Sequence, residues 1–369
     1  MIIEISDEFA DFDELKWRPY AASLEHLITA HCNGWHILTP SRKVARGMVE
    51  RCNLSVRQLE ILQFYIVDKI AVLVGQARTA DATILAVPDD YEGRPSRDNQ
   101  IVVRLRTFDD MSACLQAQLL TENSAADGKY ILTLANLVAR DLGYGVGLSL
   151  ELVHGGGAGT AVKYKEMLES NRPALCVVDS DRTYPSSALG STAKAIVKQG
   201  MSNEGQTVQA KILPVREIEN TIPISFLLQV YGDNLVINRK IGKICKYISS
   251  LKTVDCPFYV LDYLDLKGGD TVDRVQAFPE PDRTIFIRAC NVLNDKNVDW
   301  DAVVPNNNIA AYDGISVNLL QFTMGYLQNN PRLDREFAAK LRKAPFWLQL
   351  EHLIRLILSF GAASSRIPA

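Results

Sequence analysis

Hydrophobic and polar positions follow three different patterns along the chain. In the first region, residues 1–115, apolar runs at 82–87 and 100–107 predict strands, and helically spaced apolar residues at 53–75 predict a long helix. The polar stretch DDYEGRPSRDNQ between the two strands predicts a loop, and Ser41 is placed to cap a further helix. These features indicate an N-terminal α/β accessory region.

In the second region, residues 116–270, strand-like apolar runs alternate with helically spaced segments. The expected strands cover 117–123, 148–153, 173–181, 211–217 and 257–266, and the expected helices cover 128–143 and 161–170. Strands that alternate with helices predict a mostly parallel sheet flanked by helices.

The third region, residues 271–369, is predicted to be mainly helical, with helices at 316–328, 333–343 and 345–360. The last of these is apolar on more than one face, which predicts a buried core helix. The alternatives for this helix are an interface between two copies of the chain and, after that, contact with a membrane surface.

Acidic residues follow three strands of the second region. The carboxyl ends of parallel strands meet at one edge of a sheet, where ligands bind, and residues two apart on an extended chain point to the same side. The acids expected at this edge are Glu122, Asp127, Asp179, Asp181, Glu217 and Glu219.

Clustered carboxylates repel one another unless a cation binds them, and hard oxygen ligands suit Mg²⁺ or Mn²⁺. Two such ions roughly 4 Å apart stabilise both the attacking and the leaving oxygen of a phosphodiester displacement. The alternative is structural, because Asp-x-Asp is common at strand ends and caps. Acids follow the first, third and fourth expected strands and glycines follow the second, and this order favours a two-metal site.

The segment from Gln118 to Asn220 resembles a toprim domain, the metal-binding module shared by topoisomerases, primases and OLD-type nucleases. The resemblance depends on a glutamate after the first strand (LLTENSAADGKY), a small-residue turn (HGGGAGT), Asp-x-Asp after the third strand (VVDSDR), and REIENTIP. The last element is similar to that of OLD-like toprim proteins of bacterial anti-phage systems.

This resemblance implies that Glu122, Asp179 and Asp181 carry the metal ions and that Asp127, Glu217 and Glu219 complete the two sites. It also implies a lysine beside the scissile phosphate, for which Lys267 in YLDLKGGD is the candidate. A surface lysine at a strand–turn junction is the alternative. The phosphate contacts expected near the acids are Arg182, Lys194, Lys198, Lys211 and Arg216.

Two further features carry weaker expectations. His154 could orient the attacking water, but a role in capping its loop is favoured. The chain contains no G-x-x-x-x-G-K-S/T pattern, so an ATPase partner of the kind that the resemblance implies would be a separate chain.

The amino-acid composition places a few limits on the binding partners and the location of the protein. The net charge of −3 means that nucleic acid must be bound through local basic patches or bridging metal. Seven cysteines without a C-x-x-C pair indicate reduced thiols, and no apolar run is long enough to span a membrane. The start of the chain lacks signal-peptide features, so a cytoplasmic protein is expected.

The sequence therefore predicts a metal-dependent endonuclease that acts on DNA or RNA, with tRNA as one candidate substrate. The resemblance adds an antiviral role beside an ATPase or sensor subunit, and a homo-oligomer is possible. The alternatives are a non-catalytic toprim-like scaffold subunit and another metal-dependent phosphoryl-transfer enzyme, such as a primase-like polymerase or a phosphatase.

Overall fold

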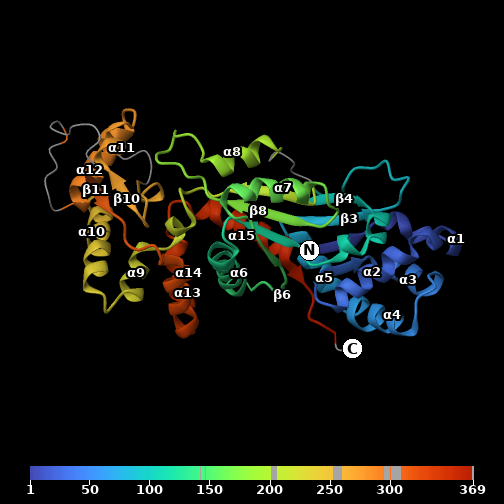
Figure 1. Cartoon of the computed structure of the whole chain (residues 1–369). Helices are drawn as coiled ribbons and strands as arrows, with labels where there is room; N and C mark the ends of the chain where they lie inside the picture. Colours follow the sequence, from blue (N-terminus) through green and yellow to red (C-terminus); the bar gives the residue numbers. More distant parts are fainter. Residues whose placement is uncertain are drawn as a thin grey trace. The chain divides into compact units, whose positions relative to one another are not determined.

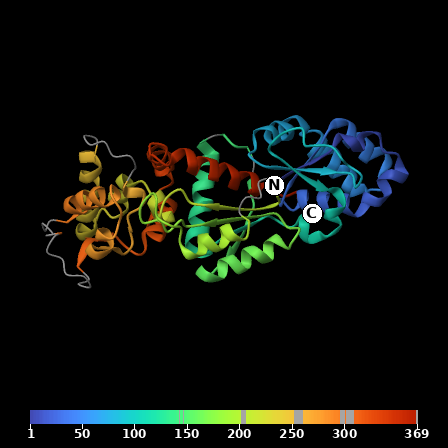
Figure 2. The same cartoon turned by 90° about the horizontal axis from the view of Figure 1, so that it is seen from above.

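A computed structural model describes residues 1–141, 143–145, 147–200, 206–251, 260–294, 300 and 309–367 of the chain. The chain divides into two compact units. Unit 1 comprises Met1–Val177, Ala195–Lys211 and Glu351–Ala369, and unit 2 comprises Val178–Lys194 and Ile212–Leu350. Figures 1 and 2 show the elements of both units from two directions.

Unit 1 begins with a four-stranded parallel sheet in the order β2-β1-β3-β4 (Figure 1). Its strands are β1 (Ile2–Ile5), β2 (Ile37–Pro40), β3 (Thr83–Val87) and β4 (Gln100–Arg104). The first three strands are almost entirely buried, as is usual for parallel strands with both faces covered. The helices between them are α1 (Glu14–Trp17), α2 (Ala21–Cys32), α3 (Arg42–Arg51), α4 (Val56–Ile61) and α5 (Ile70–Thr79).

A second four-stranded sheet has the order β7-β5-β8-β9, in which β5 pairs in parallel with both β7 and β8. Its elements are β5 (Gln118–Thr121), α6 (Lys129–Asp141), β7 (Glu151–His154), α7 (Thr160–Leu168), β8 (Ala174–Val178), α8 (Ser191–Lys198) and β9 (Val208–Ile212). The chain moves from β5 to β7 in one direction and from β7 to β8 in the other. Right-handed crossovers in opposite directions put α6 and α7 on opposite faces of the sheet, as Figure 1 shows.

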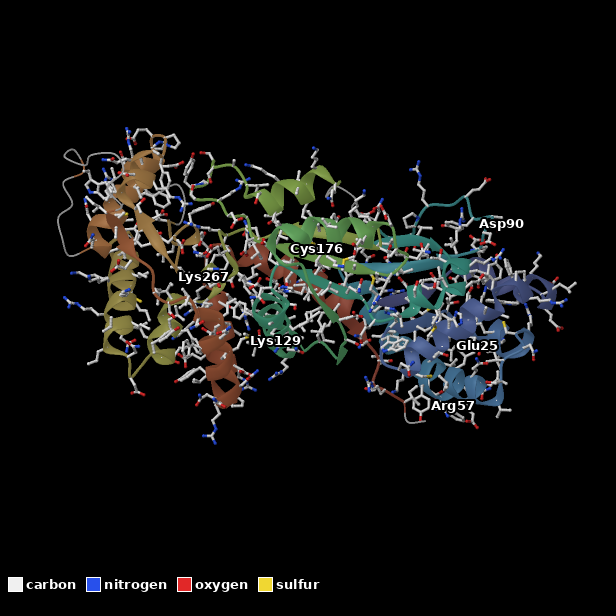
Figure 3. The ribbon with its side chains drawn as sticks, viewed as in Figure 1. Glu25, Arg57, Asp90, Lys129, Cys176 and Lys267 are labelled. Atoms are coloured by element: carbon white, nitrogen blue, oxygen red, sulfur yellow. The ribbon has the colours of Figure 1, made fainter. Side chains whose placement is uncertain are left out.

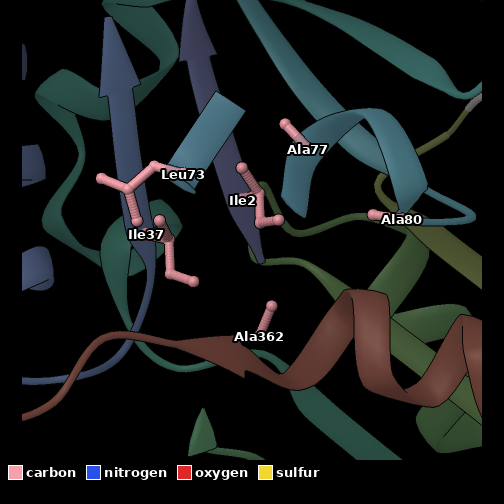
Figure 4. Packing of buried hydrophobic residues seen from close by; sticks show 6 residues of the cluster. All are labelled: Ile2, Ile37, Leu73, Ala77, Ala80 and Ala362. Atoms are coloured by element: carbon pink, nitrogen blue, oxygen red, sulfur yellow. The ribbon is translucent and has the colours of Figure 1, made fainter. Parts of the chain in front are cut away.

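The carboxyl-terminal helix α15 (Trp347–Gly361) supplies part of the core of unit 1. Leu353, Ile357 and Phe360 are each at most 5% exposed, which confirms the predicted core helix. After α15, β12 (Ala362–Ala363) pairs with β6 (Gly147–Leu148). Figure 4 shows the apolar cluster to which Ala362 of β12 belongs, formed by Ile2, Ile37, Leu73, Ala77, Ala80 and Ala362.

Unit 2 combines helices with the short antiparallel pair β10 (Gly269–Thr271) and β11 (Ala310–Asp313). Aromatic rings fill its interior: Phe226 meets Phe337 edge to face with centroids 4.9 Å apart, and Phe278 meets Phe286 in the same way. Its helices are α9 (Ile224–Val230), α10 (Leu235–Leu251), α11 (Val272–Gln276), α12 (Asp282–Leu293), α13 (Leu319–Asn329) and α14 (Asp334–Leu341).

Two predicted strands are wrong in the residues that the structure describes. The strand predicted at 211–217 belongs to β9 only up to Ile212, and the chain then turns at Pro214, which has no N–H for a sheet hydrogen bond. Within the strand predicted at 257–266, Val260–Asp262 form a 3₁₀ helix instead, and residues 257–259 lie outside the described residues.

Other expectations are corrected in detail. The helix predicted at 53–75 is divided into α4, a π-helical segment at Leu62–Val67, and α5, which continues to Thr79. The strand predicted at 148–153 is divided between β6 and β7. Strands β1 and β2 were not anticipated, although the predicted α/β character of the N-terminal region is confirmed.

The predicted fold class is confirmed at the level of an α/β protein with parallel sheets flanked by helices. The two units do not coincide with the regions 1–115, 116–270 and 271–369, so that division stays a prediction. Among the described residues, no helix has both the length and the apolar character needed to cross a membrane.

Candidate functional site

Acidic side chains of unit 2 gather around Lys267, which Figure 3 labels. The turn after β9 carries Glu217 and Glu219, and the Nζ atom of Lys267 lies 3.3 Å from a carboxylate oxygen of each. Asp179 follows β8 directly, and its Oδ1 accepts a hydrogen bond of 3.0 Å from the backbone N–H of Ile218 in the same turn. We call Asp179, Glu217, Glu219 and Lys267 the lysine–carboxylate cluster.

Burial dominates the electrostatics of this cluster. The side chain of Glu219 is 6% exposed and that of Glu217 is 15% exposed, and this burial raises the pKa of both carboxyl groups although Lys267 opposes the shift. Burial alone would lower the pKa of Lys267, but the carboxylates of Glu219, Glu217 and Asp179 raise it above its ordinary value. The ammonium group is therefore held in its charged form.

Asn220 fixes the turn that carries Glu217 and Glu219. Its side-chain amide donates hydrogen bonds of 2.8 and 2.9 Å to the carbonyls of Leu261 and Leu264, and its Oδ1 accepts one of 3.0 Å from the N–H of Glu217. Asn220 is 6% exposed, so water does not compete for these bonds. It thus joins the acidic turn to the segment that leads to Lys267.

Arg216 was expected to contact a substrate phosphate, but the structure gives it a different environment. Its guanidinium group is buried, donates hydrogen bonds to Asp265 at 3.2 Å and Asp270 at 3.3 Å, and belongs to a residue that is 5% exposed. Asp265 also accepts hydrogen bonds from the N–H groups of Lys267 and Gly268. This geometry fits a role in positioning Lys267 and the acidic turn better than direct contact with a substrate.

Asp181 has an unusual backbone. Its φ is +52°, and it is the one non-glycine residue with a positive φ among those that the structure describes. Its exposed side chain packs against Gly190, where an added Cβ would lie 2.0 Å from Oδ2 and 2.5 Å from Cβ of Asp181. The neighbouring Ser180 is 3% exposed and donates a hydrogen bond of 2.7 Å to the carbonyl of Val215. Strained backbone of this kind is common at functional sites.

In unit 1, Glu122 is half-buried and follows β5. The N–H groups of Gly155 and Gly156 donate hydrogen bonds of 2.8 and 3.0 Å to the carbonyls of Thr121 and Glu122. A Cβ on Gly155 would lie 2.2 Å from the hydroxyl of Thr160, so only glycine permits this approach. The turn HGGGAGT therefore packs directly against the glutamate segment.

Asp127 and His154 stabilise the loop that follows Glu122. A carboxylate oxygen of Asp127 accepts a hydrogen bond of 3.0 Å from the N–H of Asn123, and Nδ1 of His154 accepts one of 3.4 Å from the N–H of Ser124. The contact of His154 agrees with its favoured role in the loop. Asp127 as a metal ligand stays a prediction, and the structure gives it a local backbone contact in addition.

The remaining predicted phosphate contacts differ in their surroundings. Arg182 is half-buried and donates a hydrogen bond of 2.8 Å to the carbonyl of Pro185, whereas Lys194 and Lys198 are exposed. Lys211 is half-buried on β9. Cys176, also labelled in Figure 3, is fully buried, and this burial and the charge of Glu122 raise its pKa.

The carboxylate oxygens of the lysine–carboxylate cluster are of the type that hard divalent cations bind. Oε2 of Glu219 is buried and has no hydrogen-bond partner among the described residues, so it is available as a ligand atom. Within the same residues, no group of three or more His, Cys, Asp or Glu side chains is arranged to hold a metal ion. Since Lys267 already supplies positive charge between Glu217 and Glu219, a cation would have to compete with its ammonium group.

Three residues of this site, Asn220, Asp265 and Asp270, were not predicted from the sequence. Asp265 and Asp270 flank Lys267 in DLKGGD, and Asn220 stands in REIEN, so their nearness to predicted residues was the available signal. Comparison of the chain with protein-family models, curated proteins and solved structures finds no match. The geometry by itself therefore defines the class of site: a buried lysine–carboxylate cluster in unit 2.

Proposed function

We propose that the protein is a nuclease that depends on Mg²⁺ or Mn²⁺ and hydrolyses phosphodiester bonds through a toprim-like site. The observation that carries this proposal is the buried pair Glu217 and Glu219, both 3.3 Å from the same lysine ammonium. A buried acidic pair with a raised pKa beside a cation is an arrangement found more often at functional sites than elsewhere.

The side chains have distinct proposed roles. Asp179, Glu217 and Glu219 would bind the metal ions, with Glu122, Asp127 and Asp181 added by the toprim resemblance. Bound metal would supply Lewis-acid stabilisation of the charge that develops on the phosphodiester. Lys267 would donate a hydrogen bond to a phosphate oxygen, and, as the resemblance implies, the metal or Glu122 would activate the attacking water. Asn220 and Arg216 would hold the acidic turn in place.

The test is a cleavage assay on plasmid DNA and on total tRNA with Mg²⁺, with Mn²⁺ and with chelator. We expect cleavage by the wild type with either metal, and a loss of at least about 100-fold in Asp179→Asn combined with Glu219→Gln. Asp233→Asn, at an exposed acid of the same unit, is the matched control. Equal cutting by the double variant and the wild type would rule out this site as the nuclease centre.

One observation favours a second candidate, a non-catalytic scaffold subunit. Lys267 balances part of the charge of Glu217 and Glu219, so the cluster needs no cation to exist. A scaffold would cut neither substrate under any metal condition, yet its folding would still depend on Glu219 and Lys267. Activity confined to nucleotides or small phosphate esters would instead indicate the other phosphoryl-transfer enzymes.

The proposed biological setting is antiviral defence, with a separate ATPase or sensor subunit that restrains the nuclease. This part of the proposal depends on the resemblance of REIENTIP to OLD-like toprim proteins and on the absence of a phosphate-binding G-x-x-x-x-G-K-S/T motif from the sequence. Substrate DNA or RNA and a second copy of the chain are the other proposed partners.

A further inference from the structure

A cavity of about 460 Å³ lies on the N-terminal sheet of unit 1. Glu4, Thr39 and Leu85 line it from three adjacent strands, and because Glu4 is in register with both of the others, all three occupy one face of the sheet. The volume falls within the roughly 300 to 1,000 Å³ of small-molecule sites. The lysine–carboxylate cluster contributes no residue to this cavity.

The cavity lies where the connections of this sheet change direction. From β1 the chain crosses to β2 on one side, and it then returns past β1 to β3 on the other side. In open parallel sheets, ligands bind beyond the carboxyl ends of the two strands at which the direction reverses. Residues 6–8, which directly follow β1, line the cavity and place it at this point.

The loop 88–99 forms another wall. It joins the parallel neighbours β3 and β4 without a helix, and Tyr91, Arg94 and Arg97 of this loop line the cavity. The hydroxyl of Tyr91 donates a hydrogen bond of 2.7 Å to the carbonyl of Arg94, and a Cβ on Gly93 would lie 2.7 Å from the ring of Tyr91. The aromatic ring is therefore held in place by its own loop, in which Figure 3 marks Asp90.

Two polar atoms of the cavity wall are buried without a hydrogen-bond partner among the described residues. They are Oγ1 of Thr39, a residue that is only 3% exposed, and Nη1 of Arg97. The other terminal nitrogen of Arg97 donates to Glu4, which also accepts hydrogen bonds from Thr83 and Gln100. Glu4 thus has its hydrogen bonds, while one guanidinium nitrogen of Arg97 and the hydroxyl of Thr39, both in residues that line the cavity, keep unused hydrogen-bonding capacity.

The charged residues that line the cavity indicate which kind of ligand it can bind. Arg78, Arg94 and Arg97 can bind an anion, whereas Asp7 and Glu8 can accept hydrogen bonds from hydroxyl groups. Tyr91 offers an aromatic surface on which a base can stack. The same two acids would repel the flanking phosphates of a continuous nucleic-acid strand, which favours a free small molecule.

We propose that this cavity binds a nucleoside monophosphate. Its phosphate contacts Arg97 Nη1, Arg94 and the hydroxyl of Thr39, and its ribose hydroxyls donate to Asp7 and Glu8. The N-terminal region is then a ligand-binding module, and this assignment does not depend on the proposed nuclease activity.

The test is isothermal titration of the full chain with adenosine 5′-monophosphate, inorganic phosphate and a short single-stranded oligonucleotide. We expect the nucleotide to bind, phosphate alone to bind more weakly, and Thr39→Val and Arg94→Ala each to weaken nucleotide binding about tenfold. Thr39→Val preserves the shape of the buried side chain, and circular dichroism verifies that each variant is folded. Arg18→Ala, at an exposed residue outside the cavity, is the control and should bind as the wild type does.

Three results would overturn the proposal. The first is no binding of the nucleotide at millimolar concentration, and the second is unchanged binding in both variants. The third is tighter binding of the oligonucleotide with the same dependence on Arg94, which would make the cavity part of a nucleic-acid surface. Since the readout is binding and not cleavage, failure of the nuclease proposal would leave these outcomes unaffected.

Discussion

The left-handed backbone of Asp181 costs about 1 kcal/mol or more relative to glycine, yet an aspartate occupies the position. A residue retained against such strain is expected to serve the site. We predict that Asp181→Gly raises the free energy of unfolding by about 1 kcal/mol while it abolishes cleavage. Urea unfolding and the plasmid assay measure the two effects.

Asp181→Asn is the control for backbone strain, because asparagine tolerates the left-handed region better than most residues. It should unfold like the wild type and still lose cleavage. Full activity in either variant would show that the carboxylate of Asp181 is not used.

A substitution at Lys267 should affect metal binding and cleavage in different ways. In Lys267→Met the ammonium no longer competes for Glu217 and Glu219, so we predict that Mg²⁺ affinity is retained or increased while cleavage falls at least about 100-fold. Calorimetric titration with Mg²⁺ measures the first quantity. Lys343→Met, at an exposed lysine, should change neither, and weaker Mg²⁺ binding by Lys267→Met would contradict the proposed competition.

The side chain of Asn220 holds the acidic turn in place through three hydrogen bonds. Asn220→Ala leaves two buried carbonyls and one N–H without their partner, so we predict a loss of about 3 kcal/mol in the free energy of unfolding, measured by urea denaturation. Asn318→Ala, at an exposed position, should change this free energy by less than about 0.5 kcal/mol. Equal stability of both variants would show that the three hydrogen bonds contribute nothing.

At the scale of single residues, the sequence identified several residues of the site but did not reveal which of them form ion pairs with one another. Glu217, Glu219 and Lys267 were each predicted, but their mutual ion pairs were not. The pairing of Arg216 with Asp265 and Asp270 joins residues 49 and 54 positions apart, which no local pattern reveals. A buried arginine also looks the same in a sequence as one that faces a phosphate.

Among the elements, α6 and the buried strand β8 were predicted well because their apolar patterns are regular. The prediction of a strand at 211–217 was wrong because the apolar residues continue into a buried turn. In this turn Val215 and Ile218 are as buried as the residues of a strand. Strands β1 and β2 were missed although they are no shorter than β5, which was found because it lies where strands and helices alternate regularly. Burial and strand formation are therefore different properties of an apolar run.

The contact between α2 and β2 predicts a pH dependence of stability. Burial, assisted by Lys69, lowers the pKa of His31 from 6.5 to about 4, and its Nδ1 accepts a hydrogen bond from the N–H of Leu38. Between pH 6.5 and pH 4, His31 binds a proton in the unfolded state but stays mostly neutral in the folded state. The contribution of His31 is therefore complete above pH 6.5 and is lost as the pH falls toward 4, by about 3 kcal/mol in total.

His31→Asn tests this source. Asparagine can present an acceptor near the position of Nδ1 but does not titrate, so the variant should lose about 3 kcal/mol less than the wild type between pH 6.5 and 4 in urea denaturation. Parallel profiles for the two proteins would assign the acid sensitivity to other groups. The buried His36, whose pKa is also lowered, would be the next one to examine.

For the molecule as a whole, a net charge of −3 predicts that nucleic acid binds weakly without divalent cations. With Lys267→Met to prevent cleavage, we predict that chelator lowers affinity for total tRNA at least about tenfold in a filter-binding assay. The same variant with Asp179→Asn and Glu219→Gln added should show a much smaller effect of chelator. Affinity that is independent of metal in both proteins would remove the cation from substrate binding.

Neither unit is a continuous stretch of chain, because the polypeptide passes between them after Val177, Lys194, Lys211 and Leu350. Any truncation at a single point therefore deletes part of one unit or leaves a fragment of the other attached. A conventional dissection at residues 115 and 270 would remove from unit 1 the helix that completes its core. Functional mapping of this protein will consequently succeed through point substitutions and internal deletions that respect all four passages, and will mislead if it relies on terminal fragments.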